Sequence, residues 1–249
     1  MESFMQANRD PGRTIKLTDQ ASAYQSGPAR AAPGIVVIQE AFGVNAFVKA
    51  TCDRFAARGY CAIAPDYYHG RTFDYADREN AIAAVNDVDD EVAMRETSAA
   101  VDALVADGVR RDAIGVVGFC MGGRLAFLAN ATLGARLVAT VSFYGGGIAP
   151  VEPKGRRKPL LDRVPMLVAP ALLIYGAKDA SIASEEHARL ARALGDANKR
   201  YTMAVFADAP HAFATFDRES FRKEAADDAW RTVDAFLAGC GLIGSPESR

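Results

Sequence analysis

The sequence contains few of the residues that mark metal-binding or disulfide-bonded proteins. Its 249 residues include three histidines and four cysteines, and no CxxC or HExxH spacing occurs. So few histidines argue against a histidine-rich metal site, and we expect neither a metal nor a cofactor. The cysteines are widely and irregularly spaced in a chain large enough to fold without cross-links, which favours free thiols.

Long apolar runs and an excess of one charge are also lacking. No stretch reaches the roughly 18 to 20 apolar residues of a membrane span, and the N-terminus lacks the continuous apolar region of a signal peptide. The 29 basic and 31 acidic residues are interspersed and give a formal charge of −2, which argues against nucleic-acid binding. We expect a cytoplasmic protein without nucleic-acid or membrane partners, and we favour a monomer.

Short apolar runs that end at Gly, Pro or Asp alternate with stretches of helical periodicity. Continuous apolar runs are typical of strands buried on both faces of a parallel sheet. The predicted strands are 34–39, 61–64, 114–119, 138–144, 171–175 and 201–206. The predicted helices are 46–57, a long one within 77–107, 122–133, 184–194 and 219–237. This alternation predicts an α/β fold with a mainly parallel, doubly wound sheet and helices on both faces.

The length and composition predict one domain over residues 1–249, because half of the residues are hydrophobic and can form one large core. Residues 1 to about 33 would add an antiparallel hairpin at an edge of the sheet. Residues from about 145 to 170 hold a GGG run, several prolines and a basic cluster, and we expect a surface connector there. The basic cluster comprises Lys154, Arg156, Arg157 and Lys158.

The pentapeptide Gly118-Phe119-Cys120-Met121-Gly122 lies between a predicted strand and a predicted helix. This is the context of the G-x-S-x-G nucleophile elbow of α/β hydrolases, here with cysteine in place of serine. The elbow lifts one side chain above the sheet and needs glycines where a Cβ would collide with backbone. It also directs the first helical N–H groups, beginning with Met121, toward developing negative charge. Alone, the short motif fits a buried cysteine in a glycine-rich turn equally well.

Two residues at the ends of later strands decide between these interpretations. Asp179 follows strand 171–175, and His211 follows strand 201–206. The carboxyl ends of strands carry the functional loops of α/β sheets. Alone, Asp179 could cap the next helix and His211 could be a satisfied loop histidine. The order Cys120, Asp179, His211 is that of nucleophile, acid and histidine in α/β hydrolases, which favours a catalytic triad.

The sequence resembles the dienelactone hydrolases, the carboxymethylenebutenolidase-like family of α/β hydrolases, from about Gly34 to Leu237. The resemblance rests on VVIQEAFGVNAF at 36–47, APDYY at 64–68, GFCMGGRLAF at 118–127, YGAKD at 175–179 and PHAF at 210–213. It implies a hydrolase of cyclic or activated esters that needs no cofactor. The catalytic residues that it implies are Cys120, Asp179, His211 and Glu40, and the oxyanion hole would use the backbone N–H groups of Ala41 and Met121.

The chain departs from the dienelactone hydrolases where they bind a substrate carboxylate. An arginine stands there four residues after the catalytic histidine, whereas this chain has Thr215. Arg78 matches the second carboxylate-binding arginine of the family. Arg218 or the basic cluster near Arg156 could replace the missing one.

Four aromatic residues at strand ends are further candidates for substrate contact. They either line an apolar pocket or pack in the core, and they are Phe42, Tyr67, Tyr144 and Phe213.

These residues predict a mechanism for cleavage of a small ester or lactone. An ordinary thiol has a pKa of about 8.5, so attack at neutral pH needs a base. We expect His211 to take the proton of Cys120, Asp179 to orient the imidazole, and water to hydrolyse the resulting thioester. A carboxylate beside a thiol disfavours the thiolate and can hold the proton itself, so Glu40 could control the reactivity of Cys120. Alternatively, Glu40 only orders the turn before helix 46–57.

Three other functions compete with this prediction. A broad carboxylesterase or thioesterase would use the same triad with a different pocket. A nucleotide-binding module would also use a glycine-rich turn, but GFCMGG has neither the GxGxxG spacing nor a P-loop lysine. A non-catalytic redox sensor would oxidise Cys120, although no resolving cysteine is evident beside it.

Overall fold

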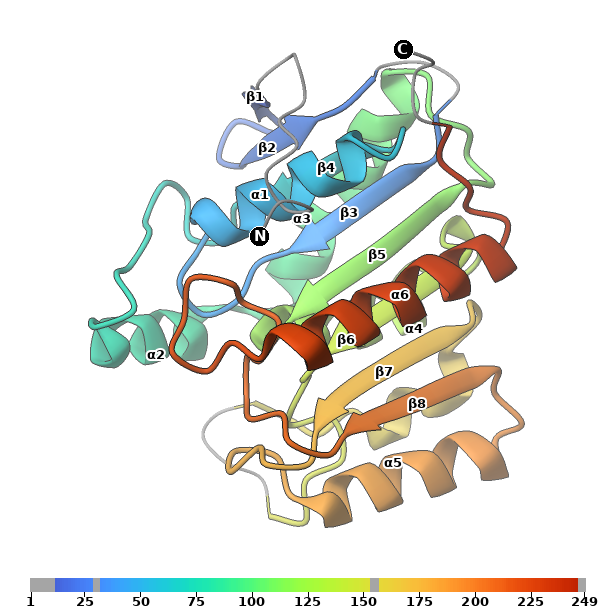
Figure 1. Cartoon of the computed structure of the whole chain (residues 1–249). Helices are drawn as coiled ribbons and strands as arrows, with labels where there is room; N and C mark the ends of the chain where they lie inside the picture. The colour runs from blue at the N-terminus through green and yellow to red at the C-terminus, as the bar shows by residue number, and fades with distance from the viewer. Residues whose placement is uncertain (1–11, 29–31, 153–156, 246–249) are drawn as a thin grey trace.

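An eight-stranded sheet runs through the centre of the protein (Figure 1). The computed structural model describes residues 12–28, 32–152 and 157–245. The strand order is β1-β2-β4-β3-β5-β6-β7-β8. The strands are β1 (Arg13–Lys16), β2 (Ser22–Ser26), β3 (Gly34–Ile38), β4 (Cys61–Pro65), β5 (Ile114–Phe119), β6 (Ala139–Phe143), β7 (Ala171–Gly176) and β8 (Tyr201–Phe206).

Six of these strands are parallel to one another, from β4 at one side to β8 at the other. The strands β3 to β7 are buried along their whole length, which explains their continuous apolar sequences. The hairpin of β1 and β2 joins the sheet through antiparallel pairing of β2 with β4. The sequence therefore predicted both the parallel sheet and the antiparallel edge.

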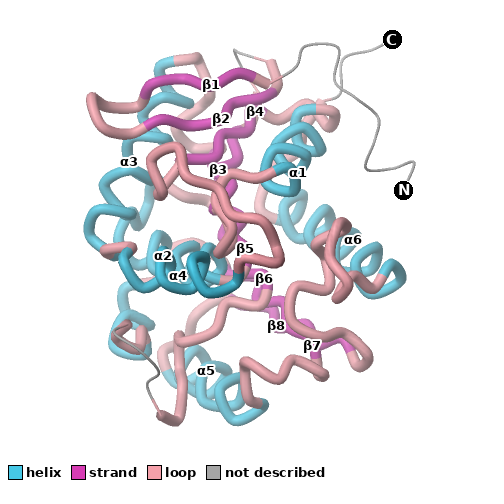
Figure 2. The backbone as a smooth tube through the Cα atoms, turned by 90° about the vertical axis from the view of Figure 1, so that its left-hand side faces the viewer, coloured by secondary structure: helices cyan, strands magenta, loops and turns pink. Residues whose placement is uncertain are grey.

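Helices cover both faces of the sheet, as predicted. Figure 2 shows α1 and α6 on one side of the strands and α3, α4 and α5 on the other. The helices are α1 (Ala46–Ala56), α2 (Arg78–Asp87), α3 (Asp90–Ala106), α4 (Met121–Leu133), α5 (Ser184–Asp196) and α6 (Lys223–Gly239), with short 3₁₀ turns η1 (Gly134–Arg136) and η2 (Leu161–Met166).

The prediction of one long helix within 77–107 was wrong. Two helices, α2 and α3, occupy the segment, because α2 ends at Asp87, Val88 is extended, and Asp89 caps α3. Its side chain accepts hydrogen bonds from the N–H groups of Glu91 and Val92, each at 2.9 Å, as an N-cap residue does. Because of this break, α2 does not continue in line with α3. It projects beyond the carboxyl ends of the central strands (Figure 1).

The connector over residues 145–170 lies only partly on the surface. Ile148 and Ala149 are fully buried, and Leu160 and Val164 also belong to the core. The expected surface connector thus packs against the domain along much of its length. Lys154 and Arg156 of the basic cluster lie outside the described residues.

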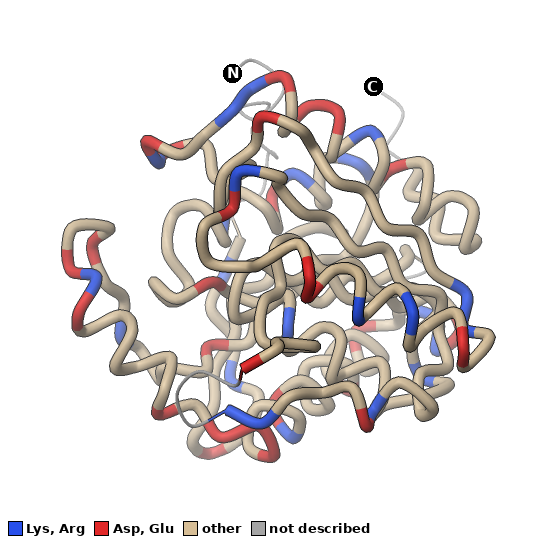
Figure 3. The backbone as a smooth tube through the Cα atoms, turned by 90° about the horizontal axis from the view of Figure 1, so that it is seen from below, with Lys and Arg blue, Asp and Glu red and all other residues tan. Residues whose placement is uncertain are grey.

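Charged residues of both signs are mixed along the described chain (Figure 3). No described helix is long and apolar enough to cross a membrane. The four cysteines are free thiols, as expected. Because β3 to β8 run in parallel, the loops after these strands meet at one edge of the sheet, where functional groups of α/β folds gather.

Candidate active site

Cys120 occupies a strained turn between β5 and α4. Its φ of 53° and ψ of −115° lie in a region that residues with a Cβ rarely adopt. A Cβ on Gly118 would collide with the carbonyl oxygen of Gly122, and a Cβ on Gly122 would collide with that of Ile38. The two glycines are therefore required for the close backbone packing of the turn, as the elbow prediction anticipated.

Asp179 and His211 lie side by side in the loops that follow β7 and β8. The Asp179 Oδ2 and His211 Nδ1 atoms are 2.6 Å apart, and the Asp179 side chain is fully buried. The other carboxylate oxygen of Asp179 accepts N–H groups from Ser181 at 2.8 Å and Ile182 at 3.2 Å. Asp179 thus orders the loop before α5 while it contacts the imidazole. It does not cap α5, because the N-cap of that helix is Ala183.

The charges at this pair follow from their contacts. Burial acts to raise the pKa of Asp179, but the hydrogen bond and charge of His211 and two loop N–H groups lower it below its ordinary value. Burial acts to lower the pKa of His211, but the charge of Cys120 and the contacts with Asp179 and Cys120 raise it to about 10. Since ionised Asp179 can only accept hydrogen bonds, His211 Nδ1 carries the donated proton.

Tyr144, at the end of β6, packs beside this pair. Its ring centroid lies 5.2 Å from that of His211. Its hydroxyl oxygen is 3.2 Å from the Thr215 hydroxyl oxygen, and both side chains are buried. Thr215 stands where the dienelactone hydrolases have a carboxylate-binding arginine, so in this chain that position supports Tyr144.

Ala41 and Met121 line the same pocket as Cys120. Within the described part of the chain, the backbone N–H group of neither residue donates to a protein acceptor. The Tyr68 hydroxyl joins the two segments, because it donates to the Ala41 carbonyl at 3.1 Å and lies 3.7 Å from Met121 Sδ. The arrangement leaves two backbone donors available to an oxygen atom in the pocket.

Glu40 is a fully buried carboxylate after β3. Burial raises its pKa, although the charge of Arg218 and hydrogen bonds with Tyr75 and Asn45 oppose the increase. Its two oxygen atoms lie at 3.5 Å from Asn45 Nδ2 and from an Arg218 terminal nitrogen. Asn45 also caps α1 by accepting the Val48 N–H at 3.1 Å, so Glu40 does help to order the turn before this helix.

Arg218 packs against two adjacent aromatic rings beside Glu40. Its guanidinium carbon lies 5.2 Å from the ring centroids of both Phe42 and Tyr75. The Tyr75 hydroxyl donates to Asp217 at 2.9 Å and accepts from Asn45 at 3.1 Å. These contacts define what we call the Glu40 network, a set of polar groups on one wall of the pocket.

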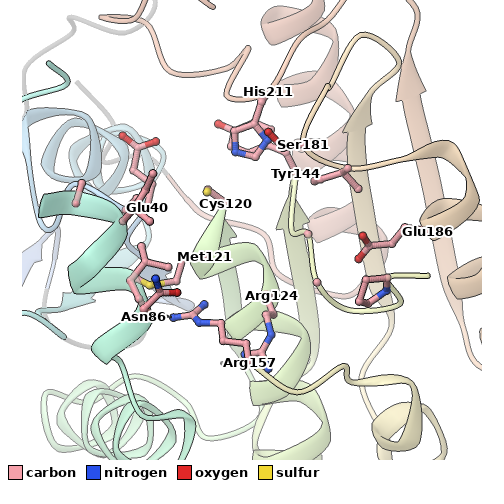
Figure 4. A pocket seen from close by; sticks show the side chains of 18 of the residues that line it. Glu40, Asn86, Cys120, Met121, Arg124, Tyr144, Arg157, Ser181, Glu186 and His211 are labelled. Carbon is pink, nitrogen blue, oxygen red and sulfur yellow. Dashed lines mark hydrogen bonds between the residues drawn. The ribbon is translucent and has the colours of Figure 1, made fainter. Parts of the chain in front are cut away.

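The pocket has a volume of about 560 Å³ and opens above Cys120 (Figure 4). Glu40, Cys120 and His211 extend toward it from three different strand ends (Figure 4). Four arginines line it, contributed by α2, α4, the connector and the loop before α6, namely Arg78, Arg124, Arg157 and Arg218.

The structure brings together most of the residues predicted from the sequence. Glu40, Ala41, Phe42, Arg78, Cys120, Met121, Tyr144 and His211 line the pocket. Tyr67 and Phe213 do not: the Tyr67 hydroxyl lies 2.6 Å from that of Thr97 in the core, and Phe213 packs on Phe206 and Tyr144. Core packing is thus the role that the structure gives these two aromatic residues.

Sequence reasoning missed Arg124 and named Arg157 only as part of a basic cluster. Arg124 lies four residues after Cys120, one helical turn further along α4, and this spacing was a usable signal. His187 of α5 stacks on Tyr175 with ring centroids 4.0 Å apart. Among the described residues, no group of His, Cys, Asp and Glu could hold a metal ion.

Comparisons with known proteins agree with the fold. The model of the dienelactone hydrolase family matches residues 21–240. A Yersinia pestis protein named "Putative carboxymethylenebutenolidase" is 33% identical over 92% of this chain and 88% of its own length. A Bradyrhizobium protein named "Probable 2-oxo-3-(5-oxofuran-2-ylidene)propanoate lactonase" is 31% identical over 82% of this chain and 83% of its own length.

Solved structures show the same likeness. The crystal structure of a "Putative Dienelactone Hydrolase" from Klebsiella pneumoniae is similar with a TM-score of 0.83 and 31% identity, covering 91% of this chain and 98% of that one. The fold is that of the α/β hydrolases. Within that class, the chain belongs to the dienelactone hydrolase family, and it is a hydrolase.

Proposed function

We propose that the protein hydrolyses a small ester or lactone through a thioester on Cys120, with His211 and Asp179 as the other members of a catalytic triad. The observation that carries the proposal is the 2.6 Å contact of His211 Nδ1 with the buried Asp179 carboxylate, beside the strained elbow at Cys120. Names of relatives that specify a carboxymethylenebutenolidase and a lactonase support the substrate class.

The first step transfers the thiol proton to His211. Asp179 occupies Nδ1, which leaves Nε2 to face Cys120, and the contact with Cys120 contributes to the raised pKa of His211. The sulfur attacks the carbonyl carbon and places negative charge on the carbonyl oxygen. The N–H groups of Ala41 and Met121 would stabilise this oxygen.

The second step breaks the bond to the leaving oxygen. His211 returns its proton to the departing alkoxide, and the acyl group remains on Cys120 as a thioester. Water then attacks the thioester with His211 as base, which releases the acid and restores the thiol. For a lactone, the alcohol stays attached to the acyl group throughout.

Glu40 would control the reactivity of Cys120. A buried carboxylate near a thiol disfavours the thiolate by like-charge repulsion, and burial of Glu40 favours its protonated form. Arg218 lies 3.5 Å from Glu40. An anionic substrate that engaged Arg218 would weaken this ion pair and allow Glu40 to move, while Arg78 would serve as a second cation for the same substrate.

The decisive experiment is a screen of small lactones and short p-nitrophenyl esters, run with the wild-type protein, Cys120→Ala and Cys240→Ala. Cys240 is a free thiol at the C-terminal end of α6 and serves as the control. Loss of the nucleophile should lower kcat/KM by on the order of 10⁴-fold or more, whereas Cys240→Ala should retain activity. Equal activity in all three folded proteins would refute the proposal.

The same screen separates the proposal from its competitors. Faster turnover of lactones than of p-nitrophenyl esters supports a lactonase, and the reverse order indicates a broad esterase with the same triad. Intact-mass detection of an acyl group on Cys120 supports the thioester. If oxidation of Cys120 occurs but no substrate forms an adduct, a redox role replaces the hydrolase proposal.

A further inference from the structure

Two neighbouring arginines lie on one side of Cys120, and the carboxylate between the helices pairs with only one of them. Arg124 is 1% exposed and donates to both oxygens of Asp90, at 2.7 and 2.8 Å. Arg157 is partly buried next to it, and burial followed by the charge of Arg124 lowers its pKa, while the charge of Asp90 opposes the shift. Among the described residues, no carboxylate forms an ion pair with Arg157.

Neither arginine has all of its donors satisfied. Arg124 donates to the Lys158 carbonyl at 2.8 Å and Arg157 to the Val85 carbonyl at 2.5 Å. The Nε–H group of each is buried and has no acceptor among the described residues. A buried charge with an unpaired donor is costly unless an anion or a polar group completes its contacts. Both side chains line the same pocket as Cys120.

The two arginines lie on the opposite side of Cys120 from His211. Figure 4 shows His211 at one end of the pocket, Cys120 in the middle, and Arg157 and Arg124 at the other end. Since His211 must protonate the leaving oxygen, the alcohol part of a substrate lies toward His211. The acyl part then extends from the carbonyl carbon toward Arg157.

We propose that Arg157, supported by Arg124, binds a carboxylate carried by the acyl part of the substrate. This inference rests on the proposed hydrolase function and names the preferred substrates as monoesters of dicarboxylic acids, or lactones with an acidic group on the acyl side. The site is distinct from Arg78 and Arg218, which stand on the α2 and Glu40 walls of the pocket. Arg157 presents the planar fork that pairs with a carboxylate.

The test uses paired esters that differ only in charge. The mono-p-nitrophenyl esters of succinate, glutarate and adipate are compared with neutral p-nitrophenyl esters of equal chain length. The ratio of kcat/KM for the anionic ester to that for the neutral ester should exceed one at the best chain length. In Arg157→Gln this ratio should fall by about 10- to 100-fold, the loss expected for a charge-assisted hydrogen bond.

Arg163→Gln is the matched control. Arg163 belongs to the same connector, is half exposed and pairs with Asp162, and it does not line the pocket at Cys120. The ratio should be unchanged in this variant, and Arg157→Lys should restore only part of it, because a lysine lacks the fork. A wild-type ratio of one or less at every chain length, or an equal ratio in Arg157→Gln, overturns the inference.

A binding experiment distinguishes failure of this site from failure of the hydrolase proposal. Calorimetry measures adipate binding to the intact protein, to Arg157→Gln and to Arg163→Gln. If no ester is cleaved but Arg157→Gln alone weakens adipate binding, the hydrolase proposal fails and the carboxylate site stands. If esters are cleaved by Cys120 but adipate does not bind, or binds all three proteins equally, the carboxylate site is wrong and the hydrolase proposal stands.

Discussion

Two buried carboxylates flank Cys120, and their surroundings differ. Asp179 receives His211 at 2.6 Å and two loop N–H groups, and its pKa is lowered. The contacts of Glu40 with Asn45 and Arg218 are 3.5 Å long, and its pKa is raised. The two carboxylates thus have opposite protonation tendencies, because Glu40 is the more deeply buried and short hydrogen bonds compensate the loss of water at Asp179.

The different surroundings of the Asp179 and Glu40 carboxylates suggest different roles for them. A carboxylate held by three hydrogen bonds keeps its charge and position, which suits the orientation of an imidazole. A carboxylate with longer contacts and a raised pKa can change charge or position when a ligand arrives. We therefore expect substitutions at Asp179 to affect the rate of the chemistry and substitutions at Glu40 to affect the reactivity of the resting thiol.

The largest effect is expected for Asp179→Asn. The amide would present an N–H group to His211 or favour the wrong tautomer, and kcat/KM should fall by about 10⁴-fold. Steady-state kinetics on the best ester measures the change. Asp196→Asn, at an exposed carboxylate that pairs with Arg192 on α5, is the control and should retain the wild-type rate. A loss of only a few fold in Asp179→Asn would show that the buried carboxylate does not support catalysis.

A smaller effect is expected for Glu40→Gln. The substitution removes the negative charge near the thiol, so Cys120 should react with iodoacetamide about tenfold faster, the effect of roughly one pKa unit. The labelling rate is read by intact mass at neutral pH, and exposed Glu185 supplies the control variant Glu185→Gln. If Glu40→Gln leaves the labelling rate of Cys120 unchanged, the idea that Glu40 controls the thiol fails.

The two carboxylates should also have opposite effects on the pH dependence of stability. Asp179 has a lowered pKa, so its contribution is present above about pH 4 and is lost as the pH falls through its folded-state pKa. Glu40 has a raised pKa, so it destabilises the fold increasingly as the pH rises above about 4 through its folded-state pKa.

Urea unfolding from acidic to neutral pH measures these contributions. The free energy of unfolding of the wild-type protein minus that of Asp179→Asn should increase with pH, and the difference from Glu40→Gln should decrease. Slopes of the same sign would contradict the contrast between the two sites.

The smallest effect is expected for Tyr75→Phe. This substitution removes the hydroxyl that donates to Asp217 and accepts from Asn45, and it keeps the ring beside Arg218. The free energy of unfolding should fall by about 1 kcal/mol, as for one ordinary hydrogen bond. A loss several times larger would mean that the Glu40 network is as firmly held as the Asp179 pair.

Much of the fold could be predicted because it depends on local patterns. Apolar runs located the parallel strands, and Ile114–Phe119 and Tyr201–Phe206 were predicted to the residue. The break between α2 and α3 was missed, since helical periodicity on both sides concealed the capping role of Asp89. The start of α6 at Lys223 lies four residues after the predicted start, because residues 219–220 form a turn and residues 221–222 are irregular.

The candidate site also contains residues that local sequence patterns predicted and contacts that they did not predict. Cys120, Asp179 and His211 were recognisable because each follows a strand, and parallel strands end at one edge. The ion pair of Glu40 and Arg218 joins residues 178 positions apart, and no local pattern indicates such a contact. The approach of Arg157 to Arg124 likewise depends on how the connector folds back over α4, which its composition did not reveal.

The residues proposed to catalyse the reaction and those that would determine substrate specificity lie on different elements of the structure. Cys120 directly follows β5, and Asp179 and His211 lie in the loops after β7 and β8, whereas α2 and the segment from Pro150 to Glu152 form outer walls of the pocket. In α2 only Ala81 and Ala84 are buried. A library of variants confined to these outer walls could therefore redirect specificity while it leaves the sheet, and the reactive thiol that it supports, intact.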